Sequence, residues 1–324
     1  MATAIDGGDV RVFWYREDAG YNAAPNDTTE KNFGKDASLQ TREINNNATR
    51  VYLPGSDTAV DIKQGQFEGS WAVEFALCNP WWLYFIYGPA GNPSGSDPYT
   101  YTYDGDPASG QLVEEYDMAD GTTDRSTLGG CVAQRAEISE ADDADYGTVL
   151  LEGFYADEET QEDVTATDQP NHAAFSPLDA ADASVQLDGS EEVIMRNLTL
   201  ILERPNMAPH TGFGSRKPIG YFTGNFAPSV EYTKLKVDSA PQQDVYGGST
   251  SVQTDVDNLA SFTFAYDQSS PSEENQLSFN ATGTFPNTYG ESGAGDPRQR
   301  VEENLGRLLS DVTVTATNSV SSAP

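Results

Sequence analysis

One stretch of the sequence, residues 65–88 (GQFEGSWAVEFALCNPWWLYFIYG), limits the possible fold more than any other. Over residues 66–77, large apolar side chains alternate with polar or small ones, which predicts a strand with one apolar and one polar face. We therefore expect Trp71, Val73 and Phe75 to be buried. At about 3.3 Å per residue this run would span ~40 Å, roughly twice the usual strand length, and that favours a barrel wall over a small sandwich.

The strand is followed directly by a helix signal. Asn79 is a suitable N-cap and Pro80 a suitable first helical residue, while Gly88 and Pro89 can end the helix. The sequence between them is rich in Trp, Leu and Phe and predicts a short apolar helix.

A second copy of the strand occurs later in the chain. Residues 65–72 (GQFEGSWA) align with residues 220–227 (GYFTGNFA) at both glycines, the phenylalanine, the second aromatic and the alanine. After a two-residue insertion, residues 73–75 (VEF) align with residues 230–232 (VEY). An even insertion keeps each side chain on its face of the strand, and a match of this kind favours duplication over coincidence.

The repeat assigns side chains to faces in both copies. Phe222 and Phe226 take the buried positions of the second strand. The opposite, polar face of the two strands is predicted to carry Glu68, Glu74, Thr223, Asn225 and Glu231.

The whole chain of 324 residues divides into three predicted parts. Residues 1–36 are expected to form a strand and an arm, residues 37–165 a first module, and residues 166–324 a second module. Short alternating runs between turn residues predict a mainly β protein, built from duplicated sandwich or barrel modules with long hairpins and short flanking helices. Residues 156–170 (ADEETQEDVTATDQP) resemble a linker, and residues 296–309 predict a helix with a proline at its first position and one apolar stripe.

The charge of the chain is extreme. The formal net charge is −33 and the pI is about 4.1, with only six lysines. Such a surface repels itself in dilute buffer, whereas in molar salt the Debye length falls to about 3 Å and the repulsion is screened. We expect adaptation to saturating salt, as in halophilic archaea and their viruses. An acidic disordered chain is the alternative, and 10% aromatic residues argue against it.

Residues that could support catalysis do not form a known pattern. Cys78 and Cys131 suggest buried free thiols, and His172 and His210 lack a companion at metal-ligand spacing. Residues 140–147 (EADDADYG) resemble a calcium loop, but no glutamate stands at its twelfth position, and an acidic hairpin loop fits better. We therefore expect no enzyme activity, no catalytic residues and no cofactor, while metal and glycan occupancy stay open.

Export and membrane signals are also lacking. No apolar stretch approaches about 20 residues, and the first residues have neither the basic nor the apolar region of a secretory signal. We expect a protein that is made in the cytoplasm without Sec export and that has no membrane partner.

Four of these features together resemble the tail tube proteins of long-tailed phages and of haloarchaeal tailed viruses. They are the Gly-x-Phe-x-Gly-x-aromatic strand, its acidic and aromatic continuation, the short Trp/Leu/Tyr-rich helix that ends at Gly88, and the LGGC strand at residues 128–131. The resemblance covers most of the chain after residue 36, and the acidic bias departs from bacterial members of the family.

The resemblance implies a structural virion protein. Its subunits would form rings that stack into a tube, with long strands of neighbouring subunits joined into an inner barrel. The polar residues Glu68, Glu74, Thr223, Asn225 and Glu231 would then face the lumen, through which DNA passes without specific binding. Expected partners are further copies of the chain and the tape-measure, tail terminator and baseplate proteins.

Two features of a ring agree with the sequence by physical argument. In a closed ring each strand edge pairs with the next subunit, so an edge that would aggregate in a monomer is satisfied. Two modules per chain predict a ring of three chains with pseudo-sixfold symmetry, and a ring of six single-fold chains is the alternative.

Two other function classes compete with this hypothesis. A halophilic cell-surface or S-layer-like β protein would suit the acidity and the glycosylation sequons, although the missing signal opposes it. An acidic β-sandwich enzyme acting on carbohydrates has carboxylates in plenty, but no spacing singles out a catalytic pair.

Overall fold

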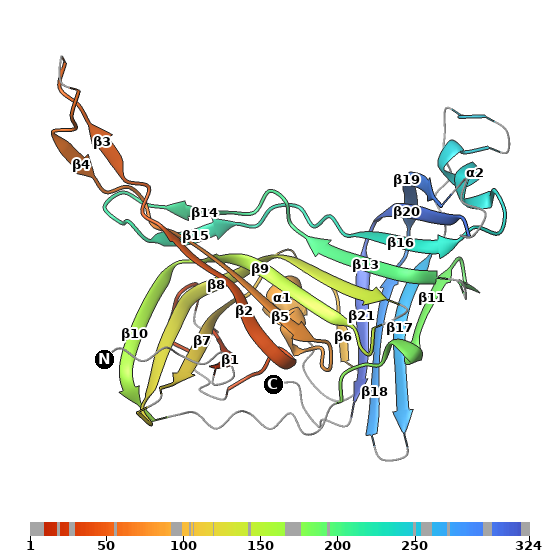
Figure 1. The fold of residues 1–324 in the computed structure, drawn as a ribbon, viewed down its shortest axis with the longest axis horizontal. Coiled ribbons are helices and arrows are strands. Elements are labelled where there is room, and N and C mark those ends of the chain that lie inside the picture. The colour runs from red at the N-terminus through yellow and green to blue at the C-terminus, as the bar shows by residue number, and fades with distance from the viewer. Residues whose placement is uncertain are drawn as a thin grey trace.

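The computed structural model shows a mainly β protein (Figure 1). The residues that it describes are 10–17, 20–25, 30–54, 57–91, 99–103, 105, 107–118, 120–141, 144–165, 176–192, 195–248, 251–253, 261–270, 273–293 and 300–318. Within these ranges no helix is long and apolar enough to cross a membrane.

The first half of the chain contains ten strands in its described part. They are β1 (Val10–Arg16), β2 (Lys35–Asn45), β3 (Thr49–Val51), β4 (Asp61–Lys63), β5 (Glu68–Ala76), β6 (Tyr99–Tyr101), β7 (Ser109–Asp117), β8 (Thr123–Ala141), β9 (Thr148–Tyr155) and β10 (Asp157–Val164). A 3₁₀ turn, η2 (Trp81–Leu83), leads into the helix α1 (Tyr84–Gly91).

The second half follows the same plan. Its elements are η3 (Ala180–Asp182), β11 (Ala183–Leu187), β12 (Ser190–Glu191), β13 (Met195–Glu203), β14 (Ala208–Thr211), β15 (Pro218–Phe222), β16 (Ser229–Leu235), α2 (Ala240–Tyr246), β17 (Phe262–Ser270), β18 (Glu273–Ala281), β19 (Thr284–Ser292), β20 (Glu302–Leu309) and β21 (Val312–Asn318).

The strand and helix predicted within residues 65–88 are present as β5, η2 and α1. β5 has only nine residues, so the length of ~40 Å predicted for this run is wrong. The side chain of Asn79 accepts a hydrogen bond from the backbone N–H of Trp81 at 3.0 Å, which satisfies one free donor at the start of η2. Gly88 has a φ of 83°, a left-handed conformation that favours glycine, so the helix is broken there as the sequence predicted.

The 19-residue strand β8 bends, and its two parts pair with different strands of the 11-stranded sheet (Figure 1). Residues up to Val132 pair with β7 and β10, and later residues pair with β9 and β13. Gly130, in the LGGC motif, lies in this bend with a φ of 64°, and its N–H donates a hydrogen bond of 2.8 Å to the Glu17 carboxylate. In the second half two consecutive strands, β18 and β19, correspond to the two parts of β8.

The two halves have the same strand order. In the first, the 11-stranded sheet branches at β8 into the orders β1-β7-β8-β10 and β2-β5-β9-β8; in the second, the corresponding orders are β11-β17-β18-β21 and β13-β16-β20-β19. Each half also carries a hairpin before its central strand, β3–β4 and β14–β15. The strands of these two orders and the two hairpins correspond one to one in chain order, while β6 and β12 each occur in one half only, so the topology is that of a duplicated unit with small additions.

The two halves are joined edge to edge. β13 of the second half pairs with β8 of the first, so that eight strands form a continuous ladder in the order β19-β20-β16-β13-β8-β9-β5-β2. Figure 1 shows β13 running beside β8 where the two halves meet.

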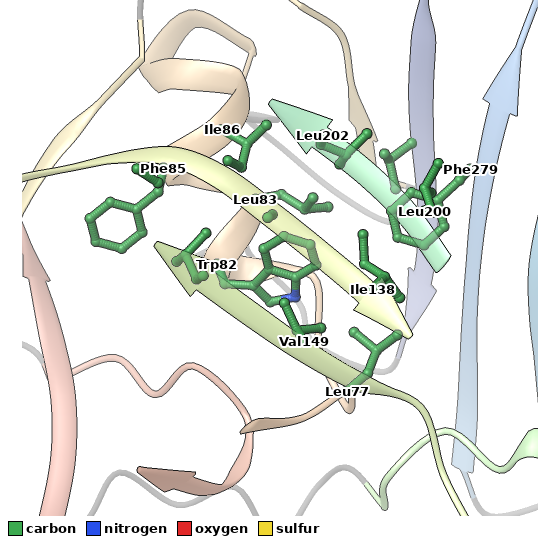
Figure 2. Packing of buried hydrophobic residues seen from close by; sticks show 14 of the residues in the cluster. Leu77, Trp82, Leu83, Phe85, Ile86, Ile138, Val149, Leu200, Leu202 and Phe279 are labelled. Atoms are coloured by element: carbon green, nitrogen blue, oxygen red, sulfur yellow. The ribbon is translucent and has the colours of Figure 1, made fainter. Parts of the chain in front are cut away.

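The halves also share one core. Leu83 and Trp82 beside α1 pack with Ile138 of β8, Leu200 of β13 and Phe279 of β18 (Figure 2). In addition, β6 of the first half pairs with β21 of the second, and the Tyr87 hydroxyl donates to the Val312 carbonyl at 2.8 Å. The two halves therefore contribute to one continuous core.

The strand expected within residues 1–36 is present as β1, which pairs along its length with β7 and buries Phe13 and Trp14. Two other expectations about elements need correction. The supposed linker 156–170 contains β10, an exposed strand paired only with β8 among the described residues. The predicted helix at 296–309 is the strand β20 over its described part, whereas Asp296, Pro297 and Gln299 lie outside the described residues.

Candidate functional site

The most distinctive surface is one face of the eight-strand ladder. On β5, Trp71, Val73 and Phe75 are at most 1% exposed, as predicted, while Glu68 and Glu74 are exposed. On β16, Val230 and Tyr232 are likewise buried and Glu231 between them is exposed. The two central strands therefore present alternate side chains in the same way.

The ladder register extends this face across all eight strands, because residues directly opposite each other point to the same side. Glu74 is opposite Leu150, which is opposite Glu137, and Glu231 is opposite Thr199. We call this surface the polar sheet face; its glutamates are Glu43, Glu68, Glu74, Glu137, Glu152, Glu203, Glu231 and Glu302.

Arg135 lies near the middle of the polar sheet face. It forms an ion pair with Glu137 on its own strand, a 3.0 Å pair with Glu152 and a 4.0 Å pair with Glu203 on β13. Burial by itself lowers the pKa of the guanidinium, but hydrogen bonds to Glu152 and Glu137 outweigh this and raise the pKa above its usual value. Arg135 and Arg196 are both paired with carboxylates, and the glutamates outnumber them, so the polar sheet face as a whole is acidic.

The ladder has two open ends. Within the described part of the chain, β2 pairs only with β5, and β19 pairs only with β20. Open edges expose backbone donors and acceptors and are sites for adding another strand. β2 is the counterpart of β13 and β19 is the counterpart of the second part of β8, so the open edges correspond to the two strands that form the internal junction.

The β14–β15 hairpin, the second arm, lies on the first half. The Tyr221 hydroxyl donates to the Pro107 carbonyl at 2.6 Å, and its ring packs against Tyr21 and Phe154 with centroids 5.3 and 6.5 Å apart. At the arm's loop, the Arg216 side chain donates to the Gly65 carbonyl at 3.1 Å.

The same loop makes two further contacts. The Phe67 N–H donates to the Arg216 carbonyl at 2.8 Å, and Lys217 pairs with Asp157 at 2.5 Å. The second arm is thus fixed to the neighbouring half at its middle and at its loop.

The β3–β4 hairpin, the first arm, projects away from the body (Figure 1). Its apolar side chains are exposed: Val51 by 37%, Tyr52 by 50%, Leu53 by 60%, Val60 by 51% and Ile62 by 61%. A cluster of this kind at the end of a projecting hairpin is typical of an interaction site.

The second strand of the repeat departs from its predicted faces. Phe222 is 62% exposed, so its predicted burial is wrong in this single chain, and Phe226 is half-buried in a stack with Tyr103 at 4.7 Å. The reason is that β15 leaves the main sheet to build the second arm, and residues 223–228, including Thr223 and Asn225, form no strand. Asn225 is exposed and Thr223 partly so, but neither belongs to the ladder that carries Glu231.

Other candidates for chemistry gave a mixed outcome. Cys78 and Cys131 are free and buried, as predicted, and burial raises the pKa of both thiols. β8 ends at residue 141 and β9 begins at residue 148, which fits the predicted acidic hairpin loop between them. Asp142 and Asp143 of this loop lie outside the described residues, as does His172. No group of three or more metal-ligating side chains occurs in the described ranges.

One cavity of about 570 Å³ lies where the halves meet, lined in part by Glu140, Asp179 and Glu192. Tyr266 donates a hydrogen bond of 2.5 Å to Glu140 beside it. Burial raises the pKa of the Glu140 carboxyl, and the hydrogen bond from Tyr266 opposes that effect.

Comparison of the sequence with known proteins gives no family: no protein-family model matches the chain, and no curated protein matches it either.

Proposed function

We propose that this protein is a structural subunit of a tube through which DNA passes, the major tail tube protein of a tailed virus adapted to high salt. One observation carries the proposal. The internal junction β8·β13 joins the counterparts of the two open edges, β19 and β2. The same contact can therefore be repeated from one chain to the next.

A contact that uses two different edges is heterologous, and it builds a closed ring when the rotation between units closes. Each chain already contains two units joined in this way, so three chains supply six. We propose a trimeric ring with pseudo-sixfold symmetry in which every ladder edge is paired. A ring of six chains is the alternative.

The polar sheet face is the proposed lumen. It carries eight glutamates, and Arg135 and Arg196 on or beside it are already in ion pairs. DNA carries about one negative charge per 1.7 Å of helix axis, so an acidic wall repels phosphates and a passing duplex is not retained. The large aromatic side chains Trp71 and Phe75 point the other way into the core, so the central strand β5 offers bases no stacking surface.

Partners follow from this role. Stacked rings of the same chain would form the tube, with a tape-measure protein inside and terminator and baseplate proteins at its ends. The location would be the virion, after assembly in the host cytoplasm.

Electron microscopy and mass measurement of the purified protein in molar salt test the proposal. We expect rings with the mass of three chains, and stacks of such rings. Planar lattices would instead indicate a surface-layer protein, and monomers at every concentration would contradict assembly altogether.

A further inference from the structure

The proposed ring leaves the first arm without a stated partner, although its apolar side chains are exposed. The second arm suggests that partner, because the two hairpins are counterparts: each connects the strand at the β2 or β13 position to the central strand of its half. The second arm lies across the half whose β8 edge pairs with β13. The first arm should lie in the same way across the unit that pairs with β2.

We propose that the first arm of one copy lies across the second half of the neighbouring copy, with its loop against Phe222 on that copy's β15. The proposal rests on the ring proposed above. It commits to a second copy of this chain as the occupant and to a definite part of its surface.

The position of the loop follows from the internal arrangement. The loop of the second arm binds the base of the first arm, where the Arg216 side chain reaches the Gly65 carbonyl and the Arg216 carbonyl accepts from the Phe67 N–H. In the sequence repeat, Gly65 and Phe67 correspond to Gly220 and Phe222. The counterpart of this contact therefore brings the loop of a first arm to Gly220 and Phe222 of the next copy.

The exposure of Phe222 agrees with such a contact. Its counterpart Phe67 is only partly exposed, because its ring packs against Tyr155 with centroids 5.7 Å apart. Phe222 is 62% exposed and Ile219 on the same strand is 55% exposed. Both surfaces of the proposed contact are thus apolar and uncovered in one chain, and apolar burial would drive their association.

The first experiment uses mixed chains, each with one added cysteine, so that only links between copies are seen. Leu53→Cys chains are mixed with Phe222→Cys chains in molar salt and treated with a short bismaleimide, and Cys78 and Cys131 are buried and should not react. We expect linked dimers in samples that contain rings. A mixture of Leu53→Cys with Val252→Cys is the matched control, because Val252 is 74% exposed, follows α2 in the chain and belongs to neither arm.

The second experiment removes the apolar surface of the arm. The variant with Tyr52→Ser, Leu53→Ser and Ile62→Ser should keep the unfolding temperature of the monomer, since all three side chains are at least half exposed. Its critical concentration for assembly should rise at least about tenfold, because apolar contacts between copies are lost. The variant with Val237→Ser and Val252→Ser should assemble as the wild type does.

The outcomes separate the two proposals. Rings that form without the Leu53–Phe222 link, and that tolerate the three serines, overturn the arm contact while the ring stands. Absence of rings in the wild-type protein, together with absence of links between the two cysteine variants, overturns both.

Discussion

Val73 on β5 and Val230 on β16 occupy equivalent positions in the two halves: each is 0% exposed, precedes an exposed glutamate and a buried aromatic residue, and lies in the central strand of its sheet. Their equivalence defines a common frame for both halves. In this frame Glu74 corresponds to Glu231, so the residues opposite them, Ser38 and Thr199, correspond as well. The frame allows the register between copies to be predicted residue by residue.

The predicted register between copies places Ser38 of one chain opposite Gly290 of the next. At the internal junction Thr199 is opposite Ser139. Ser139 pairs with Thr148 of β9, two residues before Leu150, the partner of Glu74. Gly290 pairs with Asn304 of β20, two residues before Gly306, the partner of Glu231, so Gly290 is the counterpart of Ser139. Directly opposite residues have Cβ atoms about 4.5–5.5 Å apart, close enough for a disulfide after a small shift. A Cβ at Gly290 would meet no atom within 4 Å.

Mixed Ser38→Cys and Gly290→Cys chains should therefore form a disulfide between copies under oxidising conditions, seen as a dimer on a non-reducing gel. Ser38→Cys mixed with Ser292→Cys, two positions further along β19, should give much less. A preference for the shifted pair would show that the register is wrong.

Salt should stabilise the folded protein strongly, because the net charge of −33 is self-repulsive at low ionic strength. We expect the unfolding temperature, measured by circular dichroism, to rise steeply between dilute buffer and molar salt, where the Debye length is about 3 Å. An unfolding temperature that does not change over this range would remove the proposal of adaptation to high salt.

Glu74→Lys should leave folding and ring assembly nearly intact, because Glu74 is exposed on the polar sheet face. It should slow the passage of DNA, since a lysine repeated around every ring offers contacts to phosphates. The measurements are the rate of genome release from virions and the retention of short duplexes by assembled tubes at low salt. Glu162→Lys, exposed on β10, is the control and should have no effect if the polar sheet face alone lines the channel.

Gly130→Ala should destabilise the fold by more than Gly121→Ala does. Both glycines have positive φ, 64° and 88°, and this alone costs a non-glycine residue about 1–2 kcal/mol. A Cβ at Gly130 would also lie 2.9 Å from the Cβ of Ala156, whereas at Gly121 it would meet nothing within 4 Å. Chemical denaturation of both variants measures the difference, which reports the packing at the bend of β8. If both variants lose the same free energy of unfolding, the bend of β8 accommodates the added Cβ without a packing cost.

Glu140→Gln should raise the unfolding temperature at neutral pH. Burial raises the pKa of the Glu140 carboxyl in the folded state, so the charged form costs stability at pH values above that pKa. As the pH falls through the folded pKa toward about 4.3, the value in an unfolded chain, this cost disappears and the gain from glutamine should shrink to zero. Glu159→Gln on the exposed side of β10 is the matched control; a gain for Glu140→Gln that does not depend on pH would contradict the explanation.

Parts of the fold could be predicted where the side-chain pattern is determined by burial. β5 and α1 were recognised because Trp71, Val73 and Phe75 face a core and Gly88 must end the helix. β2 was missed because an edge strand that is half exposed on both faces needs few apolar residues, and Lys35–Asn45 has only Leu39 and Ile44 as large ones. The same reasoning explains why the charged strand β10 was mistaken for a linker.

The error at residues 296–309 has a different cause. Leu305, Leu308 and Leu309 fit a helical stripe, but in the structure Leu308 is 48% exposed while Glu303 and Arg307 alternate with Leu305 and Leu309 on the buried side. Arg307 is held there by a 3.1 Å hydrogen bond to the Tyr232 hydroxyl. Because charged residues occupy two of the buried positions of β20, the apolar residues of this segment do not alternate, and a hydrophobicity pattern does not indicate a strand.

The polar sheet face was foreseen only in part. Glu68, Glu74 and Glu231 are exposed on the ladder as predicted, but Thr223 and Asn225 belong to a segment that has left the sheet. The edges and arms could not be predicted, since they depend on which strands pair across the chain, and a sequence repeat shows equivalence without showing adjacency.

Strand β6 determines how an assembled ring would respond to force. It belongs to the first half of the sequence but pairs with β21, so a pull between the two halves of one chain loads the β6·β21 and β8·β13 ladders together. Tyr101 opposite Val314 and Leu200 opposite Ile138 must then give way at the same moment. In the proposed ring, a junction between copies would have no covalent connection and no counterpart of the β6·β21 pairing. A bent tube would accordingly open at three seams per ring and flex there, while the other three junctions stay shut.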